Sequence, residues 1–320
     1  RMASDLEDQM AKLERTTSEK EGLVKEMEIA RGLQQRLLPA AAPSIQGIDI
    51  AAYNIPAREV GGDFYDFIPV AEDHLGVVIA DVSGKGMSAA IFMGLSRTIV
   101  RASTTSSPNP VLAIRQANTL ICRDSTSGMF VTLFYAVLDA NKRFRYINAG
   151  HNPPLFFKSG EDHPVPLKAK GIALGVKPDI DLCEEDIQLA SGDIVVLYTD
   201  GVNEAMNESG EAFGLDRLIR VVQSHREMNA GELLAVIQGS VIDFAGRQPQ
   251  FDDLVRQQLR QVSIPVDDLA LFGPVQPGDG LEQGRFARAV GANQRNDFPF
   301  IYVEGDAVHG LDTAIGYIEV

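Results

Sequence analysis

V-G-G-D-F-Y-D-F, residues 60–67, places two adjacent glycines directly before Asp63, and an aromatic pair then separates that aspartate from Asp66. A sharp turn, or a backbone position with positive φ, would account for the two glycines. Neither accounts for the two carboxylates, which would then lie in water at a surface turn by chance. Whether they form a site depends on how other aspartates in the chain are presented.

Aspartates at three other places follow an apolar run or stand beside glycine. They are Asp81 in V-V-I-A-D-V-S-G-K-G, Asp200 in V-V-L-Y-T-D-G-V, and the pair Asp252–Asp253 in Q-F-D-D-L. For any one of them, a turn or cap residue is the simpler interpretation. Four such places in one acidic chain favour a site instead, because strand ends and the loops after them hold side chains at fixed geometry.

The residue types in these motifs indicate a particular kind of metal site. Clustered carboxylates without histidine or thiolate ligands suit hard cations that prefer oxygen, such as Mg²⁺ or Mn²⁺. Two such ions about 4 Å apart share a bridging water, lower its pKa and direct in-line attack on phosphorus. Gly61 and Gly62 would then let the backbone approach the ions beside Asp63 and leave room for a phosphate.

The composition is that of an ordinary globular protein, and it excludes several classes of function. The 320 residues are 45% hydrophobic and 23% charged, which is enough chain for one large or two modest domains. The net charge of −15 is a poor match for nucleic acid or anionic lipid. The two cysteines, Cys122 and Cys183, form no disulfide framework, which predicts a reducing compartment. No apolar run approaches the roughly 20 residues that span a bilayer.

The order of the periodic segments predicts an α+β fold. Strands are expected at 48–52, 74–80, 129–138, 143–148 and 193–199. Helices are expected at 87–101, 110–121, 215–224 and 231–245. Asn109 is expected to cap the second helix, with Pro110 at its first position. Strands in runs and helices in pairs are typical of layered antiparallel sheets covered by helices.

The charge-rich segment from residue 1 to about 38 contains no proline and is predicted to form one further helix, which Pro39 ends. Several of its residues repeat with the 4-3 step of an a/d seam: Leu6, Met10, Leu13, Thr17, Lys20, Val24 and Met27. Thr17 and Lys20 weaken the seam in its middle. Two interpretations remain open, namely an amphipathic helix lying on the domain and a parallel coiled coil that joins two protomers.

Taken in order, the motifs resemble those of the stage-II-sporulation-E/RsbU type of bacterial serine/threonine phosphatase, a branch of the metal-dependent PPM (PP2C-like) class. The similar stretches are A-R-G-L-Q-Q-R-L-L-P, V-G-G-D-F-Y-D, A-D-V-S-G-K-G, M-F-V-T-L-F-Y-A-V-L-D, N-A-G-H-N-P-P, L-Y-T-D-G-V-N-E-A and Q-F-D-D. They cover about residues 30 to 255. The resemblance implies an α-β-β-α sandwich and three parts: a linker helix over 1–38, a phosphatase domain over 39–275 and an unassigned tail over 276–320.

The resemblance also implies a role for each aspartate in a site with two Mn²⁺ or Mg²⁺ ions. Asp81 would bridge both ions, and the Val82 carbonyl would bind one of them. Asp200 and Asp252 would complete the shell of one ion, while Asp63 would serve the other, largely through water. A metal-bound hydroxide would attack phosphorus without a covalent phosphoenzyme, so that Asp63, Asp81 and Asp200 would be catalytic through that water.

Five residues near this site are implied as substrate-binding candidates. Asn148, Gly150 and His151 belong to the N-A-G-H-N-P-P signature, and Gly84 and Lys85 belong to the loop beside the metals. His151 is a candidate general acid. A histidine that is packed or hydrogen-bonded in a loop is the simpler interpretation, because metal-bound water can supply the protons.

The resemblance further implies a place in signalling. Family members remove phosphate from phosphoserine or phosphothreonine of small regulatory proteins, typically STAS-domain anti-anti-sigma factors of partner-switching pathways. R-M-A-S-D-L-E at residues 1–7 resembles the end of a HAMP signalling helix, which implies a fragment: the cytoplasmic part of a membrane-anchored sensor. The N-terminal helix would then join a homodimer and carry the signal to the metal site. No nucleic-acid partner is expected.

One part of the chain departs from the family pattern. Family members follow the last aspartate pair with a strand of the type D-D-[IM]-T-[LV]-V, whereas V-R-Q-Q-L-R-Q-V after Leu254 is polar and helix-like. The later segment V-D-D-L-A-L-F-G-P-V, residues 266–275, has a better strand pattern, so Asp267 is an alternative to Asp252 as the last ligand. A broken ligand would favour an alternative function, a catalytically impaired signalling module that binds a partner protein.

Overall fold

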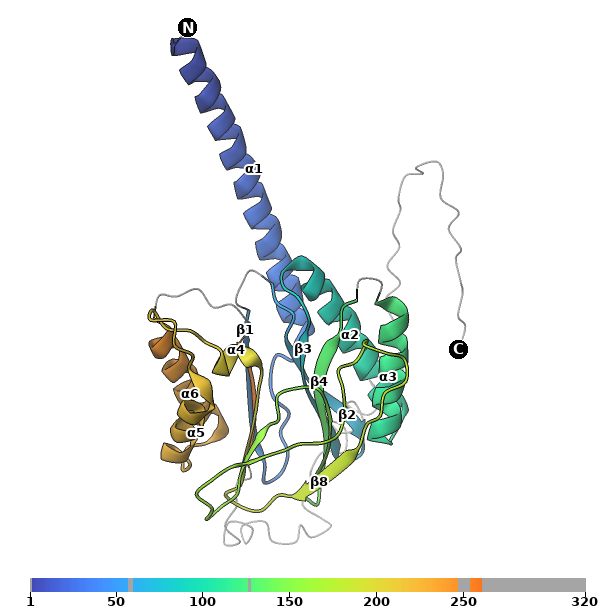
Figure 1. Ribbon diagram of the computed structural model, residues 1–320. Helices are drawn as coiled ribbons and strands as arrows, with labels where there is room; N and C mark the ends of the chain where they lie inside the picture. The colour runs from blue at the N-terminus through green and yellow to red at the C-terminus, as the bar shows by residue number, and fades with distance from the viewer. Residues whose placement is uncertain (1, 57–59, 126–127, 247–253, 261–320) are drawn as a thin grey trace, which may run out of the picture. The chain divides into compact units, whose positions relative to one another are not determined.

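The computed structural model describes residues 2–56, 60–125, 128–246 and 254–260. Within these residues, two antiparallel five-stranded sheets lie face to face, and helices cover the outer face of each sheet (Figure 1). This arrangement is the α-β-β-α sandwich that the sequence predicts.

In spatial order, the strands of the first sheet are β1 (Asp49–Ile55), β10 (Leu254–Arg260), β9 (Ile194–Tyr198), β6 (Leu155–Phe157) and β7 (Val165–Pro166). Those of the second sheet are β2 (Phe64–Ala71), β3 (His74–Val82), β4 (Val131–Asp139), β5 (Arg143–Ala149) and β8 (Glu184–Gln188). The helices are α1 (Met2–Leu37), α2 (Met87–Ser106), α3 (Pro110–Asp124), α4 (Asp200–Asn203), α5 (Gly214–Ser224) and α6 (Ala230–Ala245). The five strands and four helices that the periodic segments predict are present, with bounds that differ by a few residues.

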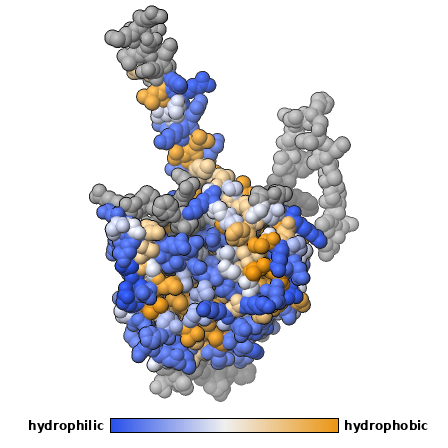
Figure 2. Space-filling view, in the orientation of Figure 1, coloured by the Kyte–Doolittle hydropathy of each residue, from blue (hydrophilic) through white to orange (hydrophobic). Residues whose placement is uncertain are grey.

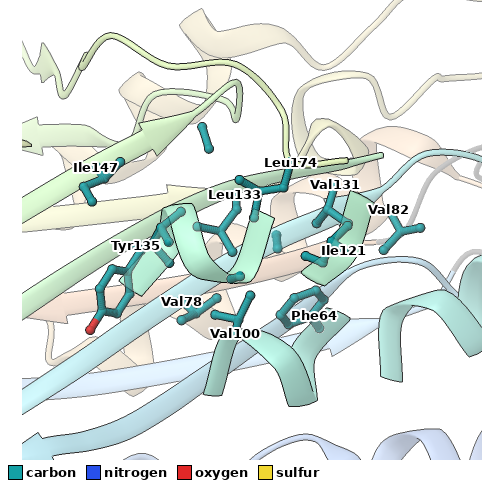
Figure 3. Packing of buried hydrophobic residues seen from close by; sticks show 14 of the residues in the cluster. Phe64, Val78, Val82, Val100, Ile121, Val131, Leu133, Tyr135, Ile147 and Leu174 are labelled. Atoms are coloured by element: carbon teal, nitrogen blue, oxygen red, sulfur yellow. The ribbon is translucent and has the colours of Figure 1, made fainter. Parts of the chain in front are cut away.

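The central strands of the second sheet are buried on both faces, since successive side chains of a strand point to opposite sides. On β3, Val78 and Ala80 join the core under α2 and α3, whereas Val77 and Ile79 join the core between the two sheets. Figure 3 shows the first of these cores, where the two helices close over the sheet. Burial on both faces explains why residues 74–80 form an almost continuous apolar run.

Helix α3 begins where the sequence signals predict. The side chain of Asn109 accepts a hydrogen bond from the Leu112 N–H at 3.0 Å, with Pro110 as the first helical residue of α3. A capping box formed by Asn229 and Glu232 begins α6. Helices α5 and α6 then pack on the outer face of the first sheet through a third hydrophobic core.

The helix-like interpretation of the segment after Leu254 is wrong. Residues 254–260 form strand β10, which pairs with β1 on one side and with β9 on the other. A polar composition does not prevent this, because strand preference depends strongly on context and here both neighbours supply main-chain partners. The alternative strand at 266–275, with Asp267, lies outside the described residues.

Helix α1 confirms the helix predicted for the first 38 residues, but it does not lie along the domain. Leu13, Val24 and Leu33 are all exposed, and the helix meets the domain through its last turn (Figure 1). There the amide of Gln34 is buried against Gly61. Among the described helices, none combines the length and the apolar character that a membrane span needs.

Candidate active site

The G-G-D motif packs against the end of β3. A Cβ atom at Gly62 would lie 2.8 Å from the Val82 carbonyl oxygen, closer than real side chains come, so this position requires glycine. The reason is close approach of two backbones, not a positive φ angle. Asp63 follows directly and is buried, with 3% of its surface exposed.

The ladder between β2 and β3 sets Asp63 beside Asp81. Phe64, the first paired residue of β2, lies opposite Ala80 of β3. Because the two strands are antiparallel, Asp63, which comes before Phe64, is next to Asp81, which comes after Ala80. Asp81 and Val82 are the last two residues of β3. The predicted proximity of these two motifs therefore has a simple origin in strand pairing.

The loop after β3 turns sharply before α2. Gly84 and Gly86 have positive φ angles of 95° and 76°, a region that favours glycine. Ser83 holds the loop against the start of β4, because its N–H donates to the Phe130 carbonyl and its Oγ accepts the Phe130 N–H, both at 2.9 Å. Lys85 is exposed at the tip of this loop.

Asp66, the second aspartate of the opening motif, has a structural role. Its carboxylate accepts hydrogen bonds from Nε and Nη2 of Arg101, at 2.9 and 2.8 Å, and pairs with Arg97 at 3.1 Å. Both arginines lie on α2, whereas Asp66 is buried on β2. The hydrogen bonds that Arg101 donates to the Asp66 carboxylate are the main cause of the raised pKa of Arg101. This aspartate attaches a helix to a sheet and is not available to a metal ion.

Asp200 begins α4 immediately after β9, at one end of the first sheet. In that sheet, Tyr198 of β9 and Tyr53 of β1 both pair with Arg256 of β10. The C-terminal ends of β9 and β1 therefore lie at the same end of the sheet. Asn54 of β1 connects this end of the first sheet to the second sheet, since its Nδ2 donates a hydrogen bond to the Asp63 carbonyl at 3.1 Å. The strand ends next to Asp63 and Asp200 thus lie at the same end of the sandwich.

The N-A-G-H-N-P-P signature is the crossover from β5 in the second sheet to β6 in the first. The Asn148 side chain closes the turn, because its Nδ2 donates to the His151 carbonyl and its Oδ1 accepts the His151 N–H. Gly150 has a φ of 74°, and a Cβ there would lie 2.9 Å from the Ala173 nitrogen. The signature is therefore explained by the geometry of the turn.

His151 is buried, with 6% of its surface exposed, and Nδ1 lies 3.0 Å from Oγ1 of Thr132. Burial lowers the pKa of His151 to about 4, and the Tyr198 backbone opposes part of that shift. Direct contact of Asn148, Gly150 and His151 with a substrate stays a prediction, as it does for Gly84 and Lys85.

The donor set fits a hard divalent cation, since it consists of aspartate oxygens and a main-chain carbonyl. The Gly62 contact also brings the buried Asp63 next to the Val82 carbonyl. Even so, no three acidic, histidine or cysteine side chains within the described ranges gather closely enough to hold a metal ion. Asp252, the remaining predicted ligand, lies outside the described residues.

Comparison with known proteins establishes the family. A family model for stage II sporulation protein E (SpoIIE) matches residues 71–257, more than half of the chain. The chain belongs to the SpoIIE family. A SpoIIE-family relative, phosphoserine phosphatase RsbU of Bacillus subtilis (strain 168), is 33% identical over 218 residues, which cover 68% of this chain and 64% of RsbU. The chain thus spans less than two thirds of RsbU.

Solved structures agree with this assignment at the level of the fold. The SiaA-PP2C domain of Pseudomonas aeruginosa matches with a TM-score of 0.66 and 21% identity, over 76% of this chain and 98% of that domain. RsbX in complex with magnesium matches with a TM-score of 0.50 and 18% identity, over 70% of this chain and 99% of RsbX. The SpoIIE-family chain therefore has the PP2C-type fold that its motifs implied.

Sequence analysis missed three side chains that connect the motifs: Gln34, Asn54 and Thr132. Gln34 and Thr132 stand inside the L-Q-Q-R-L-L-P and M-F-V-T-L-F-Y-A-V-L-D stretches, so a signal for them was present but had no assigned partner. Asn54 carries no such signal, because its importance comes only from the strand that it faces.

Proposed function

We propose that this chain is a metal-dependent phosphoprotein phosphatase specific for phosphoserine or phosphothreonine. The observation that carries the proposal is the contact between Gly62 and the Val82 carbonyl, which brings Asp63 beside the end of β3 and Asp81. Asp200 begins its helix at the same end of the sandwich. Membership of the SpoIIE family and the phosphoserine phosphatase activity in RsbU's name support the same function.

The ligands of two Mn²⁺ or Mg²⁺ ions would be Asp63, Asp81, the Val82 carbonyl, Asp200 and Asp252. Aspartate and carbonyl oxygens match the preference of both cations, and the RsbX structure contains magnesium. Strand β10 supports Asp252 over Asp267, because it begins two positions after Asp252 in the sequence and pairs with β9, the strand before Asp200. When bound, the ions would supply activation of water and stabilisation of the charge on the phosphoryl group.

The residues of the chain itself would orient the ions and the substrate. Asp63 is buried and anchored through its own carbonyl by Asn54, so its carboxylate is held in place before any ligand arrives. The loop with Gly84 and Lys85 is exposed next to Asp81, where the backbone leaves room and the ammonium group would attract a phosphate.

The substrate would be a phosphorylated regulatory protein, and we propose a STAS domain of the anti-anti-sigma type. Similarity to the phosphoserine phosphatase RsbU supports a phosphoprotein substrate. The net charge of −15 is unfavourable for binding a nucleic acid instead. The helix-like segment that favoured an impaired binding module is strand β10, so that alternative loses its support.

The N-terminal helix would join two protomers and relay a signal, as in the cytoplasmic part of a membrane-anchored, HAMP-linked sensor. Its apolar residues, such as Leu13 and Val24, are exposed and are not covered by any other part of the described chain. At its end, Gln34 makes two hydrogen bonds with Gly61, at 2.7 and 3.0 Å, two residues before Asp63. A shift of α1 would therefore reach the metal site through one buried amide.

The proposal is tested by turnover of p-nitrophenyl phosphate and of a phosphoserine protein with Mn²⁺, with and without chelator. Asp81→Asn and Asp200→Asn should each lower turnover by at least about a hundredfold, because each removes a carboxylate that would hold the ions on which transition-state stabilisation depends. Asp179→Asn is the matched control, since Asp179 is exposed and belongs to a loop outside the strands and helices. A parent protein with neither metal-dependent turnover nor affinity for Mn²⁺ would leave the impaired binding module as the better function.

A further inference from the structure

We propose that the side-chain amide of Asn54 is a positioning group at the divalent-ion site, with one role at each end. Its Nδ2 holds the backbone of Asp63, and its Oδ1 accepts a hydrogen bond from water that the bound ions hold. The inference rests on the phosphatase function proposed above. It deepens that function, because Asn54 is not among the predicted ligands and belongs to none of the motifs that resemble the family.

The strand pattern directs Asn54 into the space between the two sheets. Successive side chains of a strand point to opposite faces. On β1, Ile50 and Ala52 pack in the core between the sheets, whereas Ile55 packs in the core on the outer face. Asn54 has the same parity as Ile50 and Ala52. It is therefore the last inward residue of β1, where a polar side chain ends an otherwise apolar series.

The register of the first sheet sets Asn54 at the end that carries Asp200. Asn54 pairs with Val255 of β10, one step beyond the residue of β10 that pairs with Tyr198. Tyr198 ends β9, and Asp200 follows two residues later. From this place, Nδ2 of Asn54 donates to the Asp63 carbonyl at 3.1 Å. The amide therefore joins the sheet of one predicted ligand to the backbone of another.

The two ends of the amide have different surroundings. Oδ1 of Asn54 is buried and has no hydrogen-bond partner among the described residues. The opposite orientation of the amide would set two acceptors against each other, Oδ1 and the Asp63 carbonyl, so the donation from Nδ2 also fixes where Oδ1 lies. A buried acceptor without a donor costs free energy. A donor is therefore expected beside Oδ1 in the ion-loaded protein.

Divalent ions at the predicted ligands would bring that donor. Mg²⁺ usually keeps several water molecules in its shell, and each such water has protons to donate. Asp63 is a predicted ligand and is also the residue whose backbone Asn54 holds, so Oδ1 lies close to the place of those waters. Oδ1 would orient one of them, because groups behind metal ligands commonly tune affinity in this way, and the water would satisfy the amide in return.

Asn118 of α3 is an amide with a purely structural role in the same protein. Its Nδ2 donates to the carbonyls of Lys177 and Pro178, and its Oδ1 accepts the Gly175 N–H, each at 2.9 Å. Both ends of this fully buried side chain are thus satisfied within the chain. Replacing Asn118 should cost stability, whereas replacing Asn54 removes one hydrogen bond together with an acceptor that lacks a donor.

Asn54→Leu tests the inference, because leucine keeps the branched shape and removes both polar ends. Affinity for Mn²⁺, measured by calorimetry, should fall roughly tenfold to a hundredfold. In chelator, the melting temperature of Asn54→Leu should stay within about 2 °C of the parent's, because the lost hydrogen bond is offset by removal of the unsatisfied acceptor. Asn118→Leu is the matched control for stability and should melt at least about 4 °C below the parent.

NMR of the nitrogen-labelled parent provides a readout that needs no activity. Addition of Mg²⁺ should shift the side-chain amide signals of Asn54 and leave those of Asn118 in place, because a new hydrogen bond at Oδ1 polarises the amide. Mn²⁺ affinity in Asn54→Leu equal to the parent's, or a metal-free Asn54→Leu protein as unstable as Asn118→Leu, would overturn the inference and leave the phosphatase proposal standing. A parent that binds no Mn²⁺ would contradict both.

Discussion

At the scale of single residues, the two aspartates of V-G-G-D-F-Y-D-F have different roles. Asp63 precedes β2 and lies beside the end of β3, whereas Asp66 is inside β2 and is neutralised by two arginines of α2. The difference follows from position in the ladder and from which helix covers each face. A carboxylate with two arginine partners is satisfied without a metal.

Gly62→Ala should inactivate the protein and destabilise it. The added Cβ would meet the Val82 carbonyl at 2.8 Å, and backbone cannot move aside as a flexible side chain does. We expect a loss of about 1–3 kcal/mol in the free energy of unfolding, with weaker Mn²⁺ binding because Asp63 shifts. Gly239→Ala is the control: a Cβ there meets nothing within 4 Å inside α6, so it should stabilise the protein by about 0.5–1 kcal/mol. Chemical denaturation measures both, and an unchanged Gly62→Ala variant would refute the close-approach argument.

At the scale of elements, α2 is the part that connects the active-site loop to the sheet. It begins directly after the S-G-K-G turn, and its arginines bind Asp66 of β2. Apolar side chains of the same helix also pack against the second sheet in a shared hydrophobic core (Figure 3). The position of the loop with Lys85 therefore depends on the packing of a helix that carries no proposed ligand.

Asp66→Asn should lower the free energy of unfolding by about 2–3 kcal/mol, because it leaves Arg97, whose side chain is 13% exposed, as a largely buried charge without its partner. Arg101 contributes less, since water screens its half-exposed guanidinium. Asp186→Asn breaks an ion pair with Arg143 that is exposed on both sides, so it should change stability little. Thermal unfolding of the two variants compares them directly, and equal melting temperatures would contradict this account.

At the scale of the whole molecule, the surface combines an acidic domain with an N-terminal helix whose apolar side chains are exposed. Figure 2 shows apolar residues along the helix among charged ones, and further apolar residues on the domain near α2. Ile91 and Leu95 of α2 are exposed, and Leu37 of α1 lies next to Gly94 of the same helix. Such surfaces are typical of an interface with another chain.

Removal of residues 1–28 should convert a dimer to a monomer and change phosphatase activity. The reason is that the deletion removes the exposed a/d residues but keeps Gln34 and its hydrogen bonds to Gly61. Gln34→Ala in the full chain should change activity without changing the oligomeric state. Gln35→Ala is the control, because Gln35 is the next residue along the helix and its side chain is exposed. Light scattering and turnover measure the two effects. Unchanged oligomeric state and activity after truncation would remove both the dimer and the relay.

The sequence by itself determined the family, the order of the motifs and the period of most strands and helices. It did so because glycine beside aspartate, apolar alternation and helix caps are local signals whose physical cause lies within a few residues. The prediction for 254–260 failed because a central strand takes its stability from neighbours that are distant in the sequence.

Only the tertiary structure decided which residues meet. It separated Asp63 from Asp66, required glycine at 62 for close approach, and buried His151 in the crossover from β5 to β6. These outcomes depend on register, on the helix that covers each face and on the path of the crossover between sheets. Such contacts join residues tens of positions apart, and no local pattern in the chain encodes them.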